Sequence, residues 1–320
     1  MKKRRIVLLA LLVFLAAVYL ANASWLAGVP EGELNLLAHR GVHQTYDNEG
    51  LTNSTCTAKR IDPPSHEFLE NTILSMQAAL DAGAEIIEID AKLTIDGEIV
   101  VFHDATLECR TNGSGKTHHQ SLAELKALDI GYGYTADNGA TYPFRGKYIG
   151  SVPTLNEALR AFPEAMFMVN LKHSKESEGE TYRDYLTTQD TTRLAFVGTN
   201  RAAAPVKEAY PDMIIQTRQN VKACLKGYIL TGWFGGMPKT CRNSYIPVPS
   251  NYRHFVWGWP HRFEKRLNKV GSRSMLTGPF EGHGVVGLDQ LEQLNIIPKN
   301  YKGVIYTNKI EVIGPEMATN

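Results

Sequence analysis

Apolar runs of strand length alternate with helix-like patterns along most of this chain, and this alternation limits the available folds more than any other feature. Apolar residues recur at helical spacing over 70–85, 121–129 and 154–162. Repeated strand–helix units indicate a parallel sheet, and about eight of them indicate a (β/α)8 TIM barrel, an α/β fold that we expect over residues 33–314. The candidate strands are residues 34–39, 85–90, 98–104, 165–172, 193–200, 212–217, 254–260, 273–280 and 302–308.

This set holds one strand more than a barrel needs, and we expect 254–260 to be the one that lies outside it. A doubly wound sheet is the alternative fold. No G-x-G-x-x-G follows the first run, which argues against a dinucleotide-binding version of that sheet. Residues 42–66 and 217–252 are rich in Gly, Pro, Asn, Ser and Thr, so we expect long loop insertions there.

The first 26 residues form a separate segment. "MKKRR" precedes an unbroken apolar run from Ile6 to Ala21, and an Ala-x-Ala follows at 21–23. This order predicts either a cleaved secretory signal or an uncleaved membrane anchor over residues 6–26. In both cases the basic end stays cytoplasmic and the remaining chain is exported, to the periplasm or the exterior.

Export changes the interpretation of the four cysteines. No pair has C-x-x-C spacing, so a zinc site is not expected, and an even number in an oxidising compartment favours two disulfides. We expect Cys56–Cys109 and Cys224–Cys241, although four cysteines allow three pairings. The formal net charge of +1, without a basic aromatic stripe, gives no support to a nucleic-acid partner.

Polar residues gather where the first four candidate strands end. In a barrel, groups at the carboxyl ends of strands lie on one rim and form the active site. Glu70, which opens the first long helix, belongs to the same rim. These residues are His39 and Arg40 after the first strand, Glu88 and Asp90 on the second, His103 and Asp104 on the third, and Asn170 and Lys172 on the fourth.

The spacing of Glu88 and Asp90 puts both carboxylates on one face of a strand. A lone E-x-D is more often a pair of surface salt bridges, but Ile86, Ile87 and Ile89 make this strand interior a costly place for unpaired charge. A hard divalent cation, Ca²⁺ or Mg²⁺, binds oxygen ligands of this kind.

Two histidines and two basic residues complete the predicted chemistry. His39 and His103 titrate near neutrality and are suited to act as acid and base in one displacement. Arg40 and Lys172 provide positive charge for a phosphate. Together with a cation, this set predicts a phosphodiester site.

The same residues, in the same order, resemble the signature of the glycerophosphodiester phosphodiesterase family. The motifs are HRG at 39–41, ENT at 70–72, E-x-D at 88–90, DG at 96–97 and HD at 103–104, supported by "PTLNEAL" and "GVIYTN". The resemblance implies a TIM barrel, a divalent cation, and hydrolysis of glycerophosphodiesters to an alcohol and glycerol 3-phosphate.

The resemblance also implies roles for individual residues. His39 and His103 match the general acid and base, and Glu88 and Asp90 match metal ligands. The remaining matches are Arg40 and Lys172 as phosphate contacts and Glu70 as a substrate contact, a metal ligand or a group that supports the ligands. The chain departs from the family where Asn170 replaces the glutamate of an E-x-K motif, so Asn170 is a variant ligand that should weaken metal binding.

Two other functions are compatible with these residues. One is a phospholipase D- or sphingomyelinase-like enzyme that acts on intact phospholipid, because the N-terminal segment brings the chain to a membrane. The other is a non-catalytic phosphate-binding barrel that has lost its third carboxylate.

Overall fold

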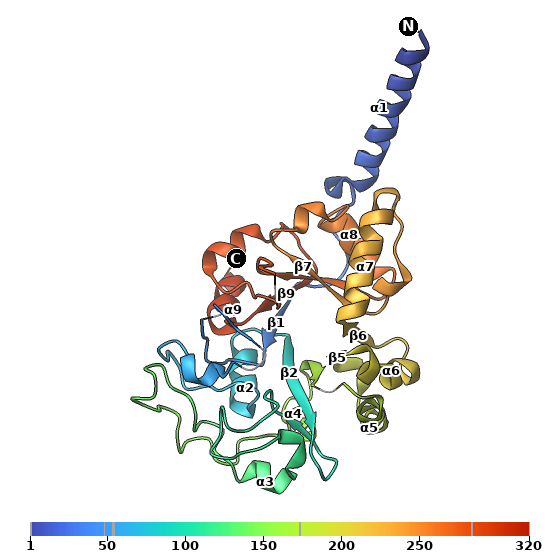
Figure 1. Cartoon of the computed structure of the whole chain (residues 1–320). Coiled ribbons are helices and arrows are strands. Elements are labelled where there is room, and N and C mark those ends of the chain that lie inside the picture. The colour runs from blue at the N-terminus through green and yellow to red at the C-terminus, as the bar shows by residue number, and fades with distance from the viewer. Residues whose placement is uncertain (1, 48, 53–54, 173, 283, 320) are drawn as a thin grey trace. The chain divides into compact units, whose positions relative to one another are not determined.

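The computed structural model describes residues 2–47, 49–52, 55–172, 174–282 and 284–319, and its strand order confirms the (β/α)8 TIM barrel. Figure 1 labels its main helices and strands. Eight parallel strands follow one another in the sheet order β6-β5-β4-β2-β1-β9-β8-β7. Near closure, the Ile215 N–H donates to Asn243 O, just before β7. The parallel strands are β1 (Asn35–His39), β2 (Ile86–Leu93), β4 (Met166–Leu171), β5 (Leu194–Gly198), β6 (Ile214–Thr217), β7 (Tyr245–Pro249), β8 (Arg273–Thr277) and β9 (Val304–Thr307).

The strand register aligns the polar residues of the rim. Glu88 on β2 stands opposite His39 on β1 and Met168 on β4, and Asp90 stands opposite Asn170. The E-x-D of β2 is therefore level with the ends of both neighbouring strands.

The prediction that His103 and Asp104 end a parallel barrel strand was wrong. They follow β3 (Ile99–Val101), which pairs antiparallel with β2 and lies off the barrel path. Two strands joined by a tight Asp96-Gly97 turn must run antiparallel, and Gly97 has the positive φ of 84° that such a turn requires. β2 continues beyond the barrel, so β3 returns to the level of Asp90, where Phe102 N–H donates to Asp90 O.

The prediction that 217–252 is a loop insertion was also wrong. This stretch holds α7 (Arg218–Thr231) and strand β7, which completes the barrel. Pro247 and Pro249 obscured β7, because proline lacks a backbone donor and usually argues against a strand. Residues 254–260 form no strand, as expected; a short 3₁₀ turn covers Arg253–Phe255.

The predicted helices are present, and their first residues show why they begin where they do. Thr72, Ser121 and Thr154 accept hydrogen bonds from backbone N–H groups of the first turn, as N-caps do. The helices besides α7 are α1 (Lys2–Asn22), α2 (Ile73–Asp81), α3 (Leu122–Lys126), α4 (Leu155–Ala161), α5 (Glu176–Leu186), α6 (Asn200–Ala209), α8 (His261–Asn268) and α9 (Ile310–Thr319).

The chain divides into two compact units. Unit 1 comprises 1–35, 214–288 and 292–306, and unit 2 comprises 36–213, 289–291 and 307–320. Each unit contains one disulfide, and both expected pairings are confirmed: Cys224–Cys241 in unit 1 and Cys56–Cys109 in unit 2.

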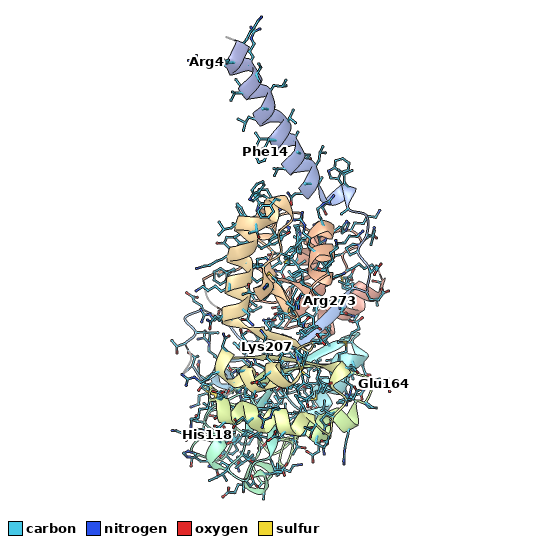
Figure 2. The ribbon with its side chains drawn as sticks, turned by 90° about the vertical axis from the view of Figure 1, so that its right-hand side faces the viewer. Arg4, Phe14, His118, Glu164, Lys207 and Arg273 are labelled. Atoms are coloured by element: carbon cyan, nitrogen blue, oxygen red, sulfur yellow. A yellow bond between two sulfur atoms is a disulfide. The ribbon has the colours of Figure 1, made fainter. Side chains whose placement is uncertain are left out.

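Helix α1 is unlike the other helices. It is long and apolar enough to cross a membrane, and none of its residues is buried. Figure 2 shows its side chains extending outward over most of its length.

Candidate active site

Asp90 is a fully buried carboxylate surrounded by donors. Lys172 Nζ lies 2.9 Å from Oδ1, and Arg40 Nε lies 3.1 Å from Oδ2. Asn71 donates to Oδ2 through its side chain at 2.9 Å and accepts from the Asp90 N–H. Burial alone would raise the pKa of Asp90, but Lys172 and Arg40 hold it well below its usual range, so this carboxylate is ionised.

Glu88 lies two residues away on the same strand and differs from Asp90 in its basic neighbours, although Asp90 Oδ1 likewise makes no hydrogen bond in the described part of the chain beyond its ion pair with Lys172. Its Oε1 accepts from Asn170 Nδ2 at 2.9 Å, whereas its buried Oε2 has no hydrogen-bond partner within the described part of the chain. His39 Nε2 lies 3.8 Å from that oxygen. Burial and the neighbouring charge of Asp90 raise the pKa of Glu88 to about 7.

These two environments bear on the expected cation. A buried carboxylate oxygen that accepts no hydrogen bond is the kind of atom that a hard divalent cation binds. The amide oxygen of Asn170 is a further potential ligand nearby. Across the described residues, however, no three His, Cys, Asp or Glu side chains already converge on one point. The residues present thus fit a cation bound chiefly through Glu88, with Asp90 and Asn170 beside it.

His39 ends β1 with its ring orientation fixed. Its Nδ1 lies 2.6 Å from Asn308 Oδ1, and Asn308 donates through Nδ2 to Asp289. Because that amide oxygen can only accept, we assign the proton to Nδ1, which leaves Nε2 as the basic nitrogen on the side of Glu88. Burial and Arg40 lower the pKa of His39 well below its usual value, which favours the neutral ring.

His103 has a carboxylate where His39 has an amide. Its Nδ1 lies 2.7 Å from Asp104 Oδ1, and its side chain is 31% exposed against 17% for His39. Burial and Arg40 lower the pKa of His103, while Asp90 and Asp104 oppose that shift. Asp104 therefore orients the ring and stabilises its protonated form.

Arg110, which the sequence analysis did not single out, links His103 to Glu70. Its Nε donates to Asp104 Oδ2 at 2.9 Å, and its buried guanidinium also pairs with Glu70. Tyr134 accepts from Arg110 and donates to Glu70, both at 2.7 Å. Burial would raise the pKa of Glu70, but Arg110, together with His43, Arg40 and the hydrogen bond from Tyr134, lowers it.

The expected substrate contact, Glu70, thus faces Arg110 and Tyr134. No motif pointed to Arg110; Asn308 closes the GVIYTN motif, but nothing in that motif indicated its contact with His39, 269 residues away. The one indication for Arg110 was its position directly after Cys109. Its NH2 group donates at 2.8 Å to Thr57, the residue after Cys56, so the disulfide and this hydrogen bond join the same two segments.

The backbone beside these groups adopts unusual conformations. Arg40 and Asn71 have positive φ values of 63° and 61°, in the left-handed region that non-glycine residues rarely occupy. Arg40 N–H donates to Glu88 O, and Asn71 N–H donates to Arg40 O. These bonds hold both residues where their side chains reach Asp90, and strained backbone of this kind concentrates at functional sites.

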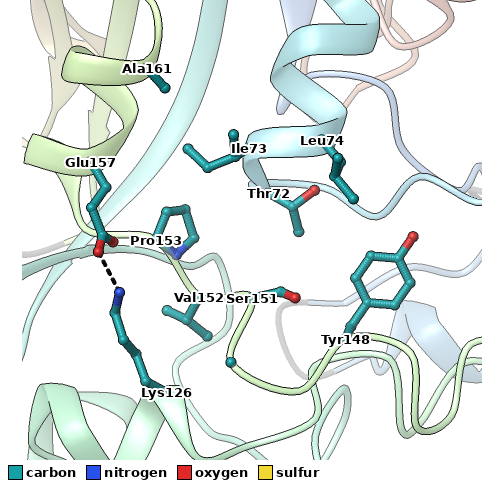
Figure 3. Close-up of a pocket in the computed structure, with 11 residues that line it drawn as sticks. Thr72, Ile73, Leu74, Lys126, Tyr148, Ser151, Val152, Pro153, Glu157 and Ala161 are labelled. Carbon is teal, nitrogen blue, oxygen red and sulfur yellow. Dashed lines mark hydrogen bonds and ion pairs between the residues drawn. The ribbon is translucent and has the colours of Figure 1, made fainter.

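A cavity of about 350 Å³ lies elsewhere in unit 2 (Figure 3). Thr72, Tyr148 and the Lys126–Glu157 ion pair line it, together with apolar residues of α2 and α4. None of the predicted catalytic residues lines this cavity.

Comparison with known proteins agrees with this arrangement. The profile of the glycerophosphoryl diester phosphodiesterase family matches residues 39–226. A curated glycerophosphodiester phosphodiesterase from Caldanaerobacter subterraneus subsp. tengcongensis is 38% identical over 104 residues, which cover 32% of this chain and 39% of that protein. The chain therefore spans well under half the length of that relative.

Solved structures share the fold. The glycerophosphoryl diester phosphodiesterase domain of an uncharacterized Mycobacterium tuberculosis protein superposes with a TM-score of 0.60 at 16% identity, covering 89% of this chain and 99% of that one. An Oleispira antarctica phosphodiesterase, in complex with the product sn-glycerol-3-phosphate, superposes with a TM-score of 0.54 at 18% identity, covering 92% and 99%.

Proposed function

Because this chain belongs to the glycerophosphoryl diester phosphodiesterase family, we propose that it hydrolyses glycerophosphodiesters to an alcohol and glycerol 3-phosphate. The observation that carries the proposal is the pair of imidazoles, His39 and His103. Each has its Nδ1 held by a side-chain acceptor, which fixes the ring and makes Nε2 the nitrogen that transfers protons.

The two histidines have different roles. His39 is the more buried, has a neutral amide partner and a strongly lowered pKa, so it acts as the base. His103 is backed by the Asp104 carboxylate, which favours the imidazolium, so it acts as the acid.

In the first step, His39 takes the proton of the glycerol hydroxyl next to the phosphate, and that oxygen forms a bond to phosphorus. The bond from phosphorus to the alcohol oxygen breaks, and His103 gives its proton to the leaving oxygen. Water then opens the resulting cyclic phosphate as the two histidines exchange roles. Arg40 and Lys172 bind the phosphate oxygens during both steps.

We also propose a divalent cation, Ca²⁺ or Mg²⁺, held by Glu88 and Asp90 and more weakly by Asn170. A bound cation at this position lowers the negative charge on the phosphate oxygens. The partnerless Oε2 of Glu88 supports this proposal.

A substrate and metal panel tests the function. The full chain is assayed on several glycerophosphodiesters and on intact phosphatidylcholine, with Ca²⁺, Mg²⁺, Mn²⁺ or a chelator. We expect divalent-dependent release of glycerol 3-phosphate. Preference for intact phosphatidylcholine would favour the phospholipase, activity that a chelator leaves unchanged would contradict the cation, and no hydrolysis at all would favour the phosphate-binding barrel.

We further propose that α1 remains as a membrane anchor and that the rest of the chain is extracytoplasmic. The four basic residues Lys2–Arg5 favour a cytoplasmic N-terminus. The two disulfides are those of an oxidising compartment. Carbonate-resistant membrane association of the chain tests the anchor. If α1 is cleaved off and the rest of the chain is released from the membrane, the anchor is contradicted.

A further inference from the structure

Exposed apolar side chains surround the end of α1 in unit 1, and we call them the collar. Trp25 and Leu230 are 69% and 72% exposed, and the other members are half exposed or partly buried. The collar comprises Trp25 and Leu26 after α1, Ile229 and Leu230 at the end of α7, and Trp233 and Phe234 in the following turn. In both whole-chain views the end of α7 lies beside the end of α1 (Figures 1 and 2).

The end of α1 is firmly attached to unit 1. Asn22 donates to Trp233 O at 2.7 Å and accepts from Arg266 at 3.0 Å. Arg266 also donates to Ala21 O, and Lys265 donates to Ala27 O. Arg266 of α8 thus binds a carbonyl in the last turn of α1, a favourable arrangement for a helix C-terminus, and Lys265 holds the segment that follows. The collar and α1 consequently form one continuous surface.

A ring contact shows how far the collar reaches along α1. The rings of Phe14 and Trp233 pack edge to face, with centroids 5.8 Å apart. Phe14 precedes Asn22 by eight residues, or about 12 Å of helix rise, and all of α1 is about 31 Å long, close to the hydrocarbon thickness of a bilayer. If α1 crosses a bilayer, the side chain of Trp233 must enter it as well.

The charge on α7 suits the lipid phosphates just outside that layer. Lys226 and Lys222 are exposed one and two turns before Leu230, on the same side of the helix. Helix α7 contains no acidic residue. Apolar and aromatic side chains followed by lysines form the pattern of segments that lie in a membrane interface.

We infer that the collar inserts into the bilayer that α1 crosses, on its extracytoplasmic side, and that Lys222 and Lys226 contact anionic lipid phosphates there. Unit 1 is then bound to the membrane by a surface as well as by a helix. This inference rests on the proposed anchor and is independent of the proposed hydrolysis.

Depth-dependent fluorescence quenching tests it. The full-length chain is reconstituted in vesicles of phosphatidylcholine and phosphatidylglycerol, with the environment-sensitive dye NBD on a cysteine introduced by Phe234→Cys. The native cysteines are all in disulfides, so the introduced thiol is the labelling site. Phe255→Cys is the matched control, because Phe255 is another exposed aromatic residue of unit 1, 71% exposed and outside the collar.

We expect quenching by spin-labelled lipid to be at least about threefold stronger at position 234 than at 255, and quenching by aqueous iodide to be correspondingly weaker. Equal iodide quenching at both positions in a carbonate-resistant chain would overturn the collar insertion and leave the anchor standing. Loss of α1 by cleavage would overturn both. Activity on a water-soluble glycerophosphodiester, measured on the same samples, reports on the proposed hydrolysis separately.

Discussion

The two disulfides cross-link regions of different character. Cys56–Cys109 closes a separation of 53 residues in unit 2, where the residues that follow it, Thr57 and Arg110, belong to the charged network behind His103. Cys224–Cys241 closes 17 residues in unit 1 and is buried in an apolar cluster that includes Tyr228 and Phe263. The first also packs against an apolar cluster but joins the two segments that carry Thr57 and Arg110, whereas the second joins the helix that carries the collar to a later turn. We therefore expect loss of the first disulfide to affect activity and loss of the second to affect the position of the collar.

The largest expected effect is a loss of activity caused by changes in unit 2, and it should leave the membrane contact of unit 1 unaffected. His103→Ala and His39→Ala should each lower kcat by about 10³-fold, because each removes a proton-transfer group. Both variants should stay in the membrane like the unmodified chain. His118→Ala, a change of an exposed histidine elsewhere in unit 2, is the control. Turnover that survives either of the first two changes would contradict the acid–base assignment.

A smaller loss tests the charged network itself. Arg110→Met should lower kcat by about 10²-fold, since Asp104 and Glu70 lose their shared guanidinium and His103 its fixed acceptor. Arg110→Lys keeps the positive charge but not the guanidinium that binds two carboxylates at once, so its kcat should lie between those of the unmodified chain and Arg110→Met. Arg266→Met removes the contacts of Arg266 with the C-terminal end of α1. This variant should leave kcat unchanged and should weaken the insertion of the collar into the membrane. Circular dichroism establishes that each variant is folded, and a change in KM alone for Arg110→Met would argue against a positioning role.

The affinity for a divalent cation in unit 2 should depend on pH. Glu88 has a pKa raised to about 7, so protons compete with a cation for it. The apparent affinity for Ca²⁺ or Mg²⁺ should fall by up to about tenfold per pH unit below 7 and level off above it. Without a cation, Glu88 should lower the free energy of unfolding as pH rises from about 4.5 to 7, because the unfolded chain ionises first. Calorimetric titration at pH 6 and pH 8 measures the affinity, and Glu88→Gln should remove its pH dependence.

The smallest effects on activity are expected when the two disulfides are removed one at a time and the variants are compared. Removing Cys56–Cys109 by paired serine substitutions should cost about 4 kcal/mol of stability, and removing Cys224–Cys241 about 3 kcal/mol, because the loop-closure entropy rises with the logarithm of loop length. The first pair should also lower kcat several-fold, while the second should leave kcat intact and reduce the lipid quenching at position 234. Chemical denaturation and turnover, measured on both, check this. Equal effects on kcat would remove the contrast between the two regions.

The barrel was predictable from sequence because seven of its eight strands are recognisable apolar runs. The eighth, β7, was missed because its two prolines resemble a loop. The Asp96-Gly97 turn already indicated a hairpin, and a connection that short excludes a parallel neighbour, so 98–104 should not have been counted among the parallel barrel strands.

The candidate site could be predicted only in part, for a physical reason. Strand periodicity and family motifs brought His39, Glu88, Asp90 and His103 to attention. Arg110 and Asn308 act through partners 6 to 269 residues away in the chain, and only folding brings those partners together. The roles of the site residues and the cation stay predictions.

The length of β2 links two parts of the site mechanically. Its first residues pair with β1 and β4 in the barrel, and its last residues pair with β3. A shift of one residue in this strand would turn Glu88 and Asp90 to the opposite face and would move His103 along with them. Deleting or inserting a single residue between 86 and 93 should therefore be far more damaging than lengthening the Thr94–Gly97 turn. The pairing of this one strand therefore sets the relative positions of His39, His103 and the two carboxylates.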